Sequence, residues 1–135
     1  MLYCPIGVNL TIVLLSAIAS MVFGGIWYSL LFGKAWAQGL GKTKEQLGNP
    51  WVGMIVMFLS LLVMATGLSL LMIFLDVQLV SGGLKLGILI GLGFVAAAML
   101  TNNVYEGRSI KLFMINAGYQ AGSIILMSVI LAYFR

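Results

Sequence analysis

The stretch WVGMIVMFLSLLVMATGLSLLMIFL, residues 51–75, decides the fold class because it contains no charged side chain. A helix needs roughly 20 mainly apolar residues to cross a hydrocarbon layer about 30 Å thick. Seven Lys and Arg and three Asp and Glu divide the rest of the chain into similar runs. The sequence therefore predicts an all-α, polytopic membrane protein, a four-transmembrane-helix bundle, from four uncharged runs: residues 1–33, 46–75, 86–105 and 112–134.

Composition supports a membrane protein and excludes a soluble one. Hydrophobic residues make up 62% of the chain and charged residues 7%, against about 25% charged residues in soluble domains. Four spans leave no room for a second folded unit, so we expect a single domain over residues 1–135. The chain has no His and a single Cys, which excludes a structural zinc site within one chain. We therefore expect no metal and no cofactor.

The span limits follow from turn and cap residues. Pro50 suits the start of the second helix, and Gly82-Gly83 is expected to form the turn before the third. Thr43 and Gln46 have capping-box spacing, which predicts a short interfacial helix in the first loop, ending near Pro50. The first run continues past a possible signal-peptide cleavage site and is expected to remain as a span. The predicted helices are residues 8–32, 51–75, 84–104 and 110–133.

Basic residues predict the orientation in the membrane, because cytoplasmic loops are enriched in Lys and Arg. Loops 33–50 and 105–111 hold five of them, and the opposite side holds two. We therefore expect a multi-pass protein of the cell membrane with both loops cytoplasmic and both termini outside. The net charge of +4 is then explained by headgroup contacts, and no nucleic-acid partner is expected. The five residues are Lys34, Lys42, Lys44, Arg108 and Lys111; the two are Lys85 and Arg135.

Small residues recur at helical spacing on three of the spans. Such faces let backbones approach closely, and close packing holds membrane helices together. The pattern fits contacts inside one bundle or contacts between copies, and with several such faces we expect a homo-oligomer. The faces are Gly83, Gly87 and Gly91; Gly118 and Gly122; and Ser16, Ser20 and Gly24.

Polar side chains gather at one predicted membrane surface, where burying them unpaired would be costly. In a structural interpretation, Glu106 and Arg108 form an ion pair around Gly107, and the asparagines bridge helices. In a functional one, the cluster lines a water-accessible cavity for an ion or small polar solute. The candidate ligand-binding residues are Trp27, Tyr28, Lys34, Asn102, Asn103, Tyr105, Glu106, Arg108, Lys111, Asn116 and Tyr119.

Two stretches of the cluster carry a family resemblance. GIWYSLLFGKAW, residues 25–36, and YEGRSIKLFMINAGY, residues 105–119, resemble the signature segments of the domain of unknown function 1761 family, small integral membrane proteins with four predicted spans. The resemblance implies no activity, but it implies that the two segments matter together. The first departs from the family pattern, because Leu30 stands where that pattern has a proline that would kink the helix.

These observations favour an oligomeric channel or transporter-like protein with a polar vestibule on the cytoplasmic side. The alternative is a membrane-embedded scaffold that binds lipid or a partner and transports nothing. An enzyme is not expected, because the chain lacks His and has one acid near the cluster for paired acid/base work. Membrane lipids are the expected surroundings in each case.

Overall fold

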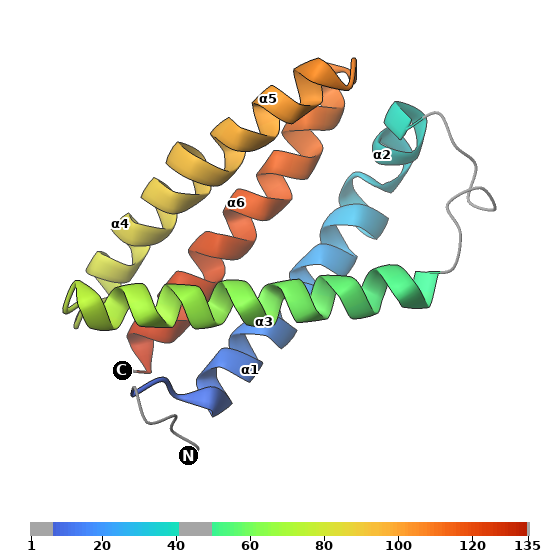
Figure 1. The fold of residues 1–135 in the computed structure, drawn as a ribbon. Helices are drawn as coiled ribbons and strands as arrows, with labels where there is room; N and C mark the ends of the chain where they lie inside the picture. The colour runs from blue at the N-terminus through green and yellow to red at the C-terminus, as the bar shows by residue number, and fades with distance from the viewer. Residues whose placement is uncertain (1–6, 41–49, 135) are drawn as a thin grey trace.

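The computed structural model describes residues 7–40 and 50–134, and these are helical apart from short connections (Figure 1). Four stretches are long and apolar enough to cross a membrane: Leu10–Leu31, Trp51–Phe74, Val80–Tyr105 and Ile110–Tyr133. The predicted all-α, four-span fold is confirmed. The elements are α1 (Leu10–Gly25), the π-helix η1 (Ile26–Leu31), α2 (Gly33–Leu40), α3 (Pro50–Phe74), α4 (Val80–Ile90), the π-helix η3 (Gly91–Ala96), α5 (Ala97–Tyr105) and α6 (Ile110–Tyr133).

The predicted limits hold best for the fourth span, whose helix covers the expected residues 110–133. The predicted turn at Gly82-Gly83 is wrong, because α4 already begins at Val80. A Cβ on Gly83 would stand 2.5 Å from the Cβ of Ala132. Gly83 therefore lies within a helix and not in a turn, and its lack of a side chain allows the close contact between α4 and α6. The short helix predicted after Thr43 lies outside the described residues, and α2 instead follows the first span directly.

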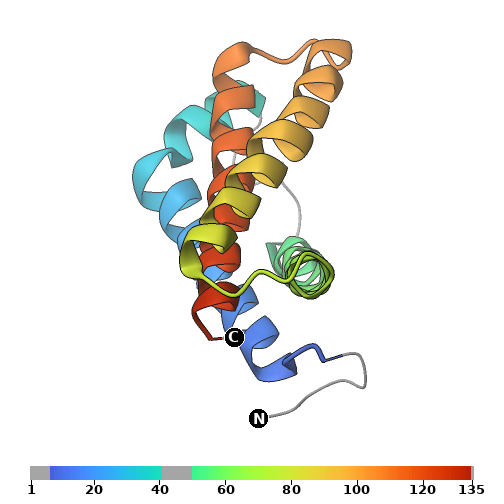
Figure 2. The same ribbon diagram turned by 90° about the vertical axis from the view of Figure 1, so that its left-hand side faces the viewer.

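The helix α6 lies at the centre of the arrangement. The third span, formed by α4, η3 and α5, runs beside α6, and α1 packs against α6 as well. The helix α3 crosses the others obliquely, so that it is seen nearly end-on in Figure 2. The connection between α5 and α6 and the short α2 lie at one end of the molecule, and the start of α1 and the end of α6 lie at the other (Figure 1).

The small-residue faces pack against other helices of the same chain. A Cβ on Gly87 would stand 2.9 Å from the Cα of Ile125, and one on Gly91 would stand 3.1 Å from the Cα of Ala121. These distances leave no space for a side chain, so the third span and α6 pack backbone to backbone. On the other side of α6, Gly118 faces the ring of Trp27. Because these glycines pack within one chain, they give no evidence for the homo-oligomer that was predicted from the same faces, and the homo-oligomer stays a prediction.

The hydrophobic core fills the end of the bundle nearer the termini. There, α1, α3, α4 and α6 contribute side chains that other parts of the protein cover almost completely. The other end of α3 differs, because residues 51–56 are all exposed. This end of α3 therefore stands away from the rest of the bundle. The core includes Val8, Ile12, Val13, Ala17, Leu61, Ala65, Leu68, Met72, Leu86, Ile124, Met127, Leu131 and Ala132.

Candidate functional site

The π-helix η1 directs two neighbouring side chains of the first span toward α6. The indole nitrogen Nε1 of Trp27 donates to the carbonyl oxygen of Ile115 at 2.9 Å. The hydroxyl of Tyr28 donates to Oδ1 of Asn116, also at 2.9 Å. In an α-helix, successive residues point about 100° apart. The wider π turn reduces that rotation, and two adjacent residues can therefore bond to one partner helix.

An aromatic cluster surrounds these bonds. The ring of Tyr28 lies edge-on to Tyr119 and to Trp36, with centroids 5.3 Å apart in both pairs. The buried Tyr119 donates its hydroxyl to the carbonyl oxygen of Ser20 at 3.2 Å. Edge-to-face pairs add to the packing energy of the rings, so the cluster fixes η1 and α2 against α6. Its members are Phe23, Trp27, Tyr28, Phe32, Trp36 and Tyr119.

A polar cavity of about 200 Å³, here called the vestibule, lies between α5 and α6 close to their connection. Its walls carry amide groups, one carboxylate and one guanidinium, beside two apolar side chains. Asn116 belongs to this wall and also to the bond with Tyr28. The vestibule is thus joined to the aromatic cluster through one residue. Its lining residues are Met99, Asn102, Asn103, Glu106, Arg108, Phe113 and Asn116.

The connection between α5 and α6 is held by side chains of the predicted cluster. The buried Asn103 donates through Nδ2 to the carbonyl oxygens of Arg108 and Ser109, at 3.1 and 3.2 Å. Gly107 adopts a φ of +71°, in the left-handed region that favours glycine. Arg108 Nε lies 2.8 Å from Glu106 Oε2. The predicted ion pair is therefore present, and the two opposite charges at the vestibule neutralise one another.

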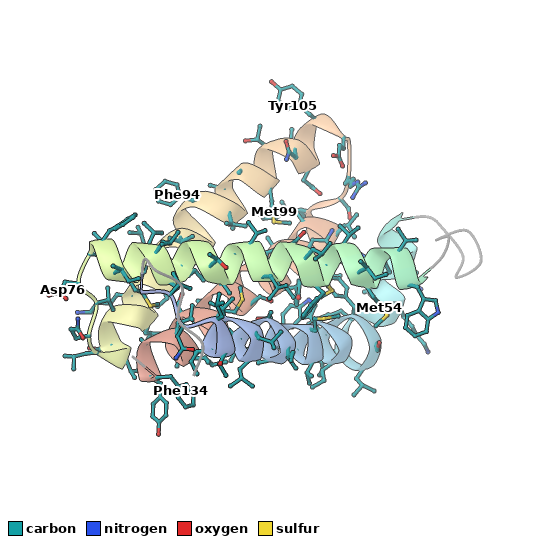
Figure 3. All side chains as sticks on the ribbon, turned by 60° about the horizontal axis from the view of Figure 1, so that its bottom comes forward. Met54, Asp76, Phe94, Met99, Tyr105 and Phe134 are labelled. Atoms are coloured by element: carbon teal, nitrogen blue, oxygen red, sulfur yellow. The ribbon has the colours of Figure 1, made fainter. Side chains whose placement is uncertain are left out.

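Three of the predicted site residues stand apart from this arrangement. Lys34 is exposed at the start of α2, and Lys111 is exposed in the first turn of α6. Tyr105 is 88% exposed and points away from the bundle (Figure 3). None of the three lines the vestibule. The structure thus brings Tyr28 into contact with Asn116 and Tyr119 and places Trp27 in the same aromatic cluster. Asn102, Asn103, Glu106, Arg108 and Asn116 lie around one cavity.

A second and larger cavity, of about 570 Å³, lies between the first span, α2 and the exposed end of α3. We call it the lateral cavity. No residue of the second span is among the site residues predicted from the sequence, yet Gly53, Met54 and Met57 belong to the wall of this cavity. Met54 extends from α3 on the side of the first span (Figure 3). The sequence feature that could have pointed to this site is Gly53, a glycine near the start of a span of mostly bulky residues. The remaining lining residues are Met21, Gly24, Gly25, Tyr28, Ser29, Trp36 and Asn116.

Comparison with protein families finds a match over nearly the whole chain. The family described as "Protein of unknown function (DUF1761)" matches residues 11–132. The chain belongs to the DUF1761 family. Comparisons with curated proteins and with solved structures find no match. Membership of the DUF1761 family therefore brings no assigned activity, and the four-span fold is shown by the structure itself.

The two segments that resemble the DUF1761 signatures meet in space. Trp27 and Tyr28 of the first segment bond to Ile115 and Asn116 of the second. Although proline is absent after Ser29, the helix still ends at Phe32, where φ is −129° and ψ is 14°. The π-helix takes the place of a proline kink in this DUF1761 protein. A Cβ on Gly33 would stand 2.8 Å from the carbonyl oxygen of Tyr28, so the break also needs this glycine.

Proposed function

We propose that this DUF1761 protein is a small transporter-like membrane protein that takes up a small polar solute in the vestibule. One observation carries the proposal: polar groups from the third and fourth spans surround a cavity of about 200 Å³ in a chain that is otherwise apolar. Polar groups at a membrane-embedded site are costly and tend to mark solute pathways. We propose no enzymatic activity and no cofactor.

The charges of the vestibule favour a neutral or zwitterionic solute over a single ion. Glu106 and Arg108 form an ion pair, and the other polar lining groups are asparagine amides. Amides donate and accept hydrogen bonds without carrying a net charge. A solute with several hydroxyl or amide groups could exchange hydrogen bonds with Asn102 and Asn116 and would leave no charge unpaired.

No open path through the bundle is seen among the described residues. Apolar side chains of the core lie between the vestibule and the end of the bundle where α1 begins and α6 ends. Passage through a single chain therefore requires a rearrangement of this core, as in a carrier, and does not follow an open channel. We also propose that the protein forms oligomers, as predicted from the sequence. In an oligomer, the solute could pass between copies of the chain.

A flux assay tests the proposed activity. Full-length protein would be reconstituted into liposomes, and stopped-flow light scattering would follow the entry of glycerol and urea. We expect faster entry than in protein-free liposomes. Asn102→Leu and Asn116→Leu should return the rate toward that background. Gln120→Leu is the matched control, because Gln120 is a half-buried amide on α6 that lines neither the vestibule nor the lateral cavity. Equal rates with and without the protein would contradict the proposal.

We further propose that the vestibule opens to the cytoplasm, on the basis of the excess of Lys and Arg on that side. Two exposed positions can report the orientation: Tyr105 at the vestibule end and Leu79 at the opposite end. In a chain with Cys4→Ser, an impermeant maleimide should label Leu79→Cys in intact cells and leave Tyr105→Cys unlabelled until the cells are opened. Labelling of both cysteines in intact cells would exclude the proposed topology.

A further inference from the structure

The lateral cavity shares only Asn116 with the vestibule and has no other part in the proposed transport step. Its volume of about 570 Å³ falls within the range of roughly 300–1,000 Å³ that is usual for small-molecule sites. It is bounded by η1 and α2 on one side and by the first turns of α3 on the other. Residues 52–56 of α3 are exposed, so a molecule bound in the cavity would cover part of this apolar surface.

Two glycines keep this cavity open. A Cβ built on Gly25 or on Gly53 would meet no atom within 4 Å. Glycine in a helix costs about 0.5–1 kcal/mol relative to alanine, and neither position offsets that cost through close helix packing. By contrast, a Cβ on the neighbouring Gly24 would stand 2.6 Å from Met57. The lack of a side chain at Gly25 and Gly53, both of which are exposed, therefore leaves open space at the wall of the lateral cavity.

The wall of the cavity indicates the chemistry of its occupant. No lining residue carries a charge, and burying an unpaired charge there would be unfavourable. Met21, Met54 and Met57 supply flexible apolar surface that adapts to chains of different shape. One end is polar: the Tyr28 hydroxyl donates to Asn116 Oδ1, and the N–H groups of the same amide can donate to a ligand oxygen.

We infer that the lateral cavity binds a neutral amphiphile, with a hydroxyl or ester head at Asn116 and an apolar chain between η1 and α3. This site differs from the vestibule in its wall and in its ligand, and it does not depend on solute transport. The two sites share Asn116 alone, so a variant at another lining residue separates them.

Photolabelling tests the inference. Full-length protein in phospholipid nanodiscs would be irradiated with a monoacylglycerol that carries a diazirine in its chain, and labelled peptides would be mapped by mass spectrometry. We expect labels on residues 21–36 and 53–57. Unlabelled monoacylglycerol, added before irradiation, should prevent this labelling by competition. A diazirine fatty acid of equal length, which carries a carboxylate, should label these residues several-fold less. Phospholipid is present throughout, so specific labelling also distinguishes the neutral amphiphile from bulk lipid.

Two glycine variants provide the decisive comparison. Gly53→Leu fills the cavity without a backbone clash and should reduce labelling of residues 21–36 several-fold. Gly93→Leu adds the same side chain to an exposed position of the third span that lines neither cavity, and should leave the labelling unchanged. Equal labelling in both variants would overturn the inference, as would labels spread evenly over the lipid-facing residues. Glycerol flux in Gly53→Leu should stay at the wild-type rate, so the outcome is independent of the transport proposal.

Discussion

Alanine at Gly87 and alanine at Gly67 make a matched pair of substitutions with opposite expected effects on stability. A Cβ at Gly87 would stand 2.9 Å from the Cα of Ile125 and 3.0 Å from the Cβ of Ser128. The first of these is a backbone atom, so α4 and α6 must move apart. A Cβ at Gly67 would meet no atom within 4 Å. Both alanines gain about 0.5–1 kcal/mol from helix propensity, and Gly87→Ala alone loses about 1–3 kcal/mol through overpacking.

The difference between the two variants isolates the packing of α4 against α6, because the propensity gain is common to both. We expect Gly67→Ala to be more stable than the wild type and Gly87→Ala to be less stable than Gly67→Ala by about 1–3 kcal/mol. The measurement is unfolding by SDS in mixed micelles, followed by tryptophan fluorescence. Equal unfolding midpoints for the two variants would refute the close approach of the two helices.

Three further outcomes concern the vestibule end. Asn103→Leu should lower the free energy of unfolding by about 1–3 kcal/mol, because two loop carbonyls lose their donor. Asn102→Leu, at an exposed position, should change the free energy of unfolding little. Similar losses for the two variants in SDS unfolding would contradict this role for Asn103. Glu106→Gln and Arg108→Ala should couple by only about 0.2–1 kcal/mol in a double-mutant cycle, since the ion pair is exposed; a larger coupling energy would mean that the pair is buried in the membrane-bound protein. Tyr28→Phe should lower stability by about 0.6–2 kcal/mol through loss of one interhelical hydrogen bond, and an unchanged unfolding midpoint would show that the bond does not form.

Much of the fold could be predicted from the sequence, because charge and apolar length determine where a membrane helix can lie. The limits of the fourth span and the small-residue faces follow from residue spacing, and the Glu106–Arg108 pair was one of the two interpretations of the polar cluster. Each of these features depends on residues near one another in the sequence or on one helical face. The structure decides that the faces of the third span and α6 meet within one chain, which the sequence left open. The family could be inferred as well, from the resemblance of two short segments to its signatures, and the match over residues 11–132 confirms it.

Other features depend on how distant helices meet and could not be predicted. The oblique path of α3 reflects packing against α1 and α6, and no residue spacing within one apolar helix encodes it. Gly25 and Gly53 line the lateral cavity with open space beside them, whereas Gly83 and Gly87 are tightly packed. A sequence shows each of them only as glycine. The π-helices likewise have no simple residue signature, and the first occurs where proline had been the expected cause of a kink.

The π-helix η3 affects how sequences of this family that differ in length should be aligned. A π turn inside an α-helix accommodates one residue more than the turn it replaces. Chains one residue shorter between Gly91 and Ala96 would thus keep α4 and α5 on the same sides of α6. An alignment gap in the third span therefore belongs within these six positions. If the gap is placed later, every residue between it and η3, Asn102 and Asn103 included, is matched to the wrong neighbour.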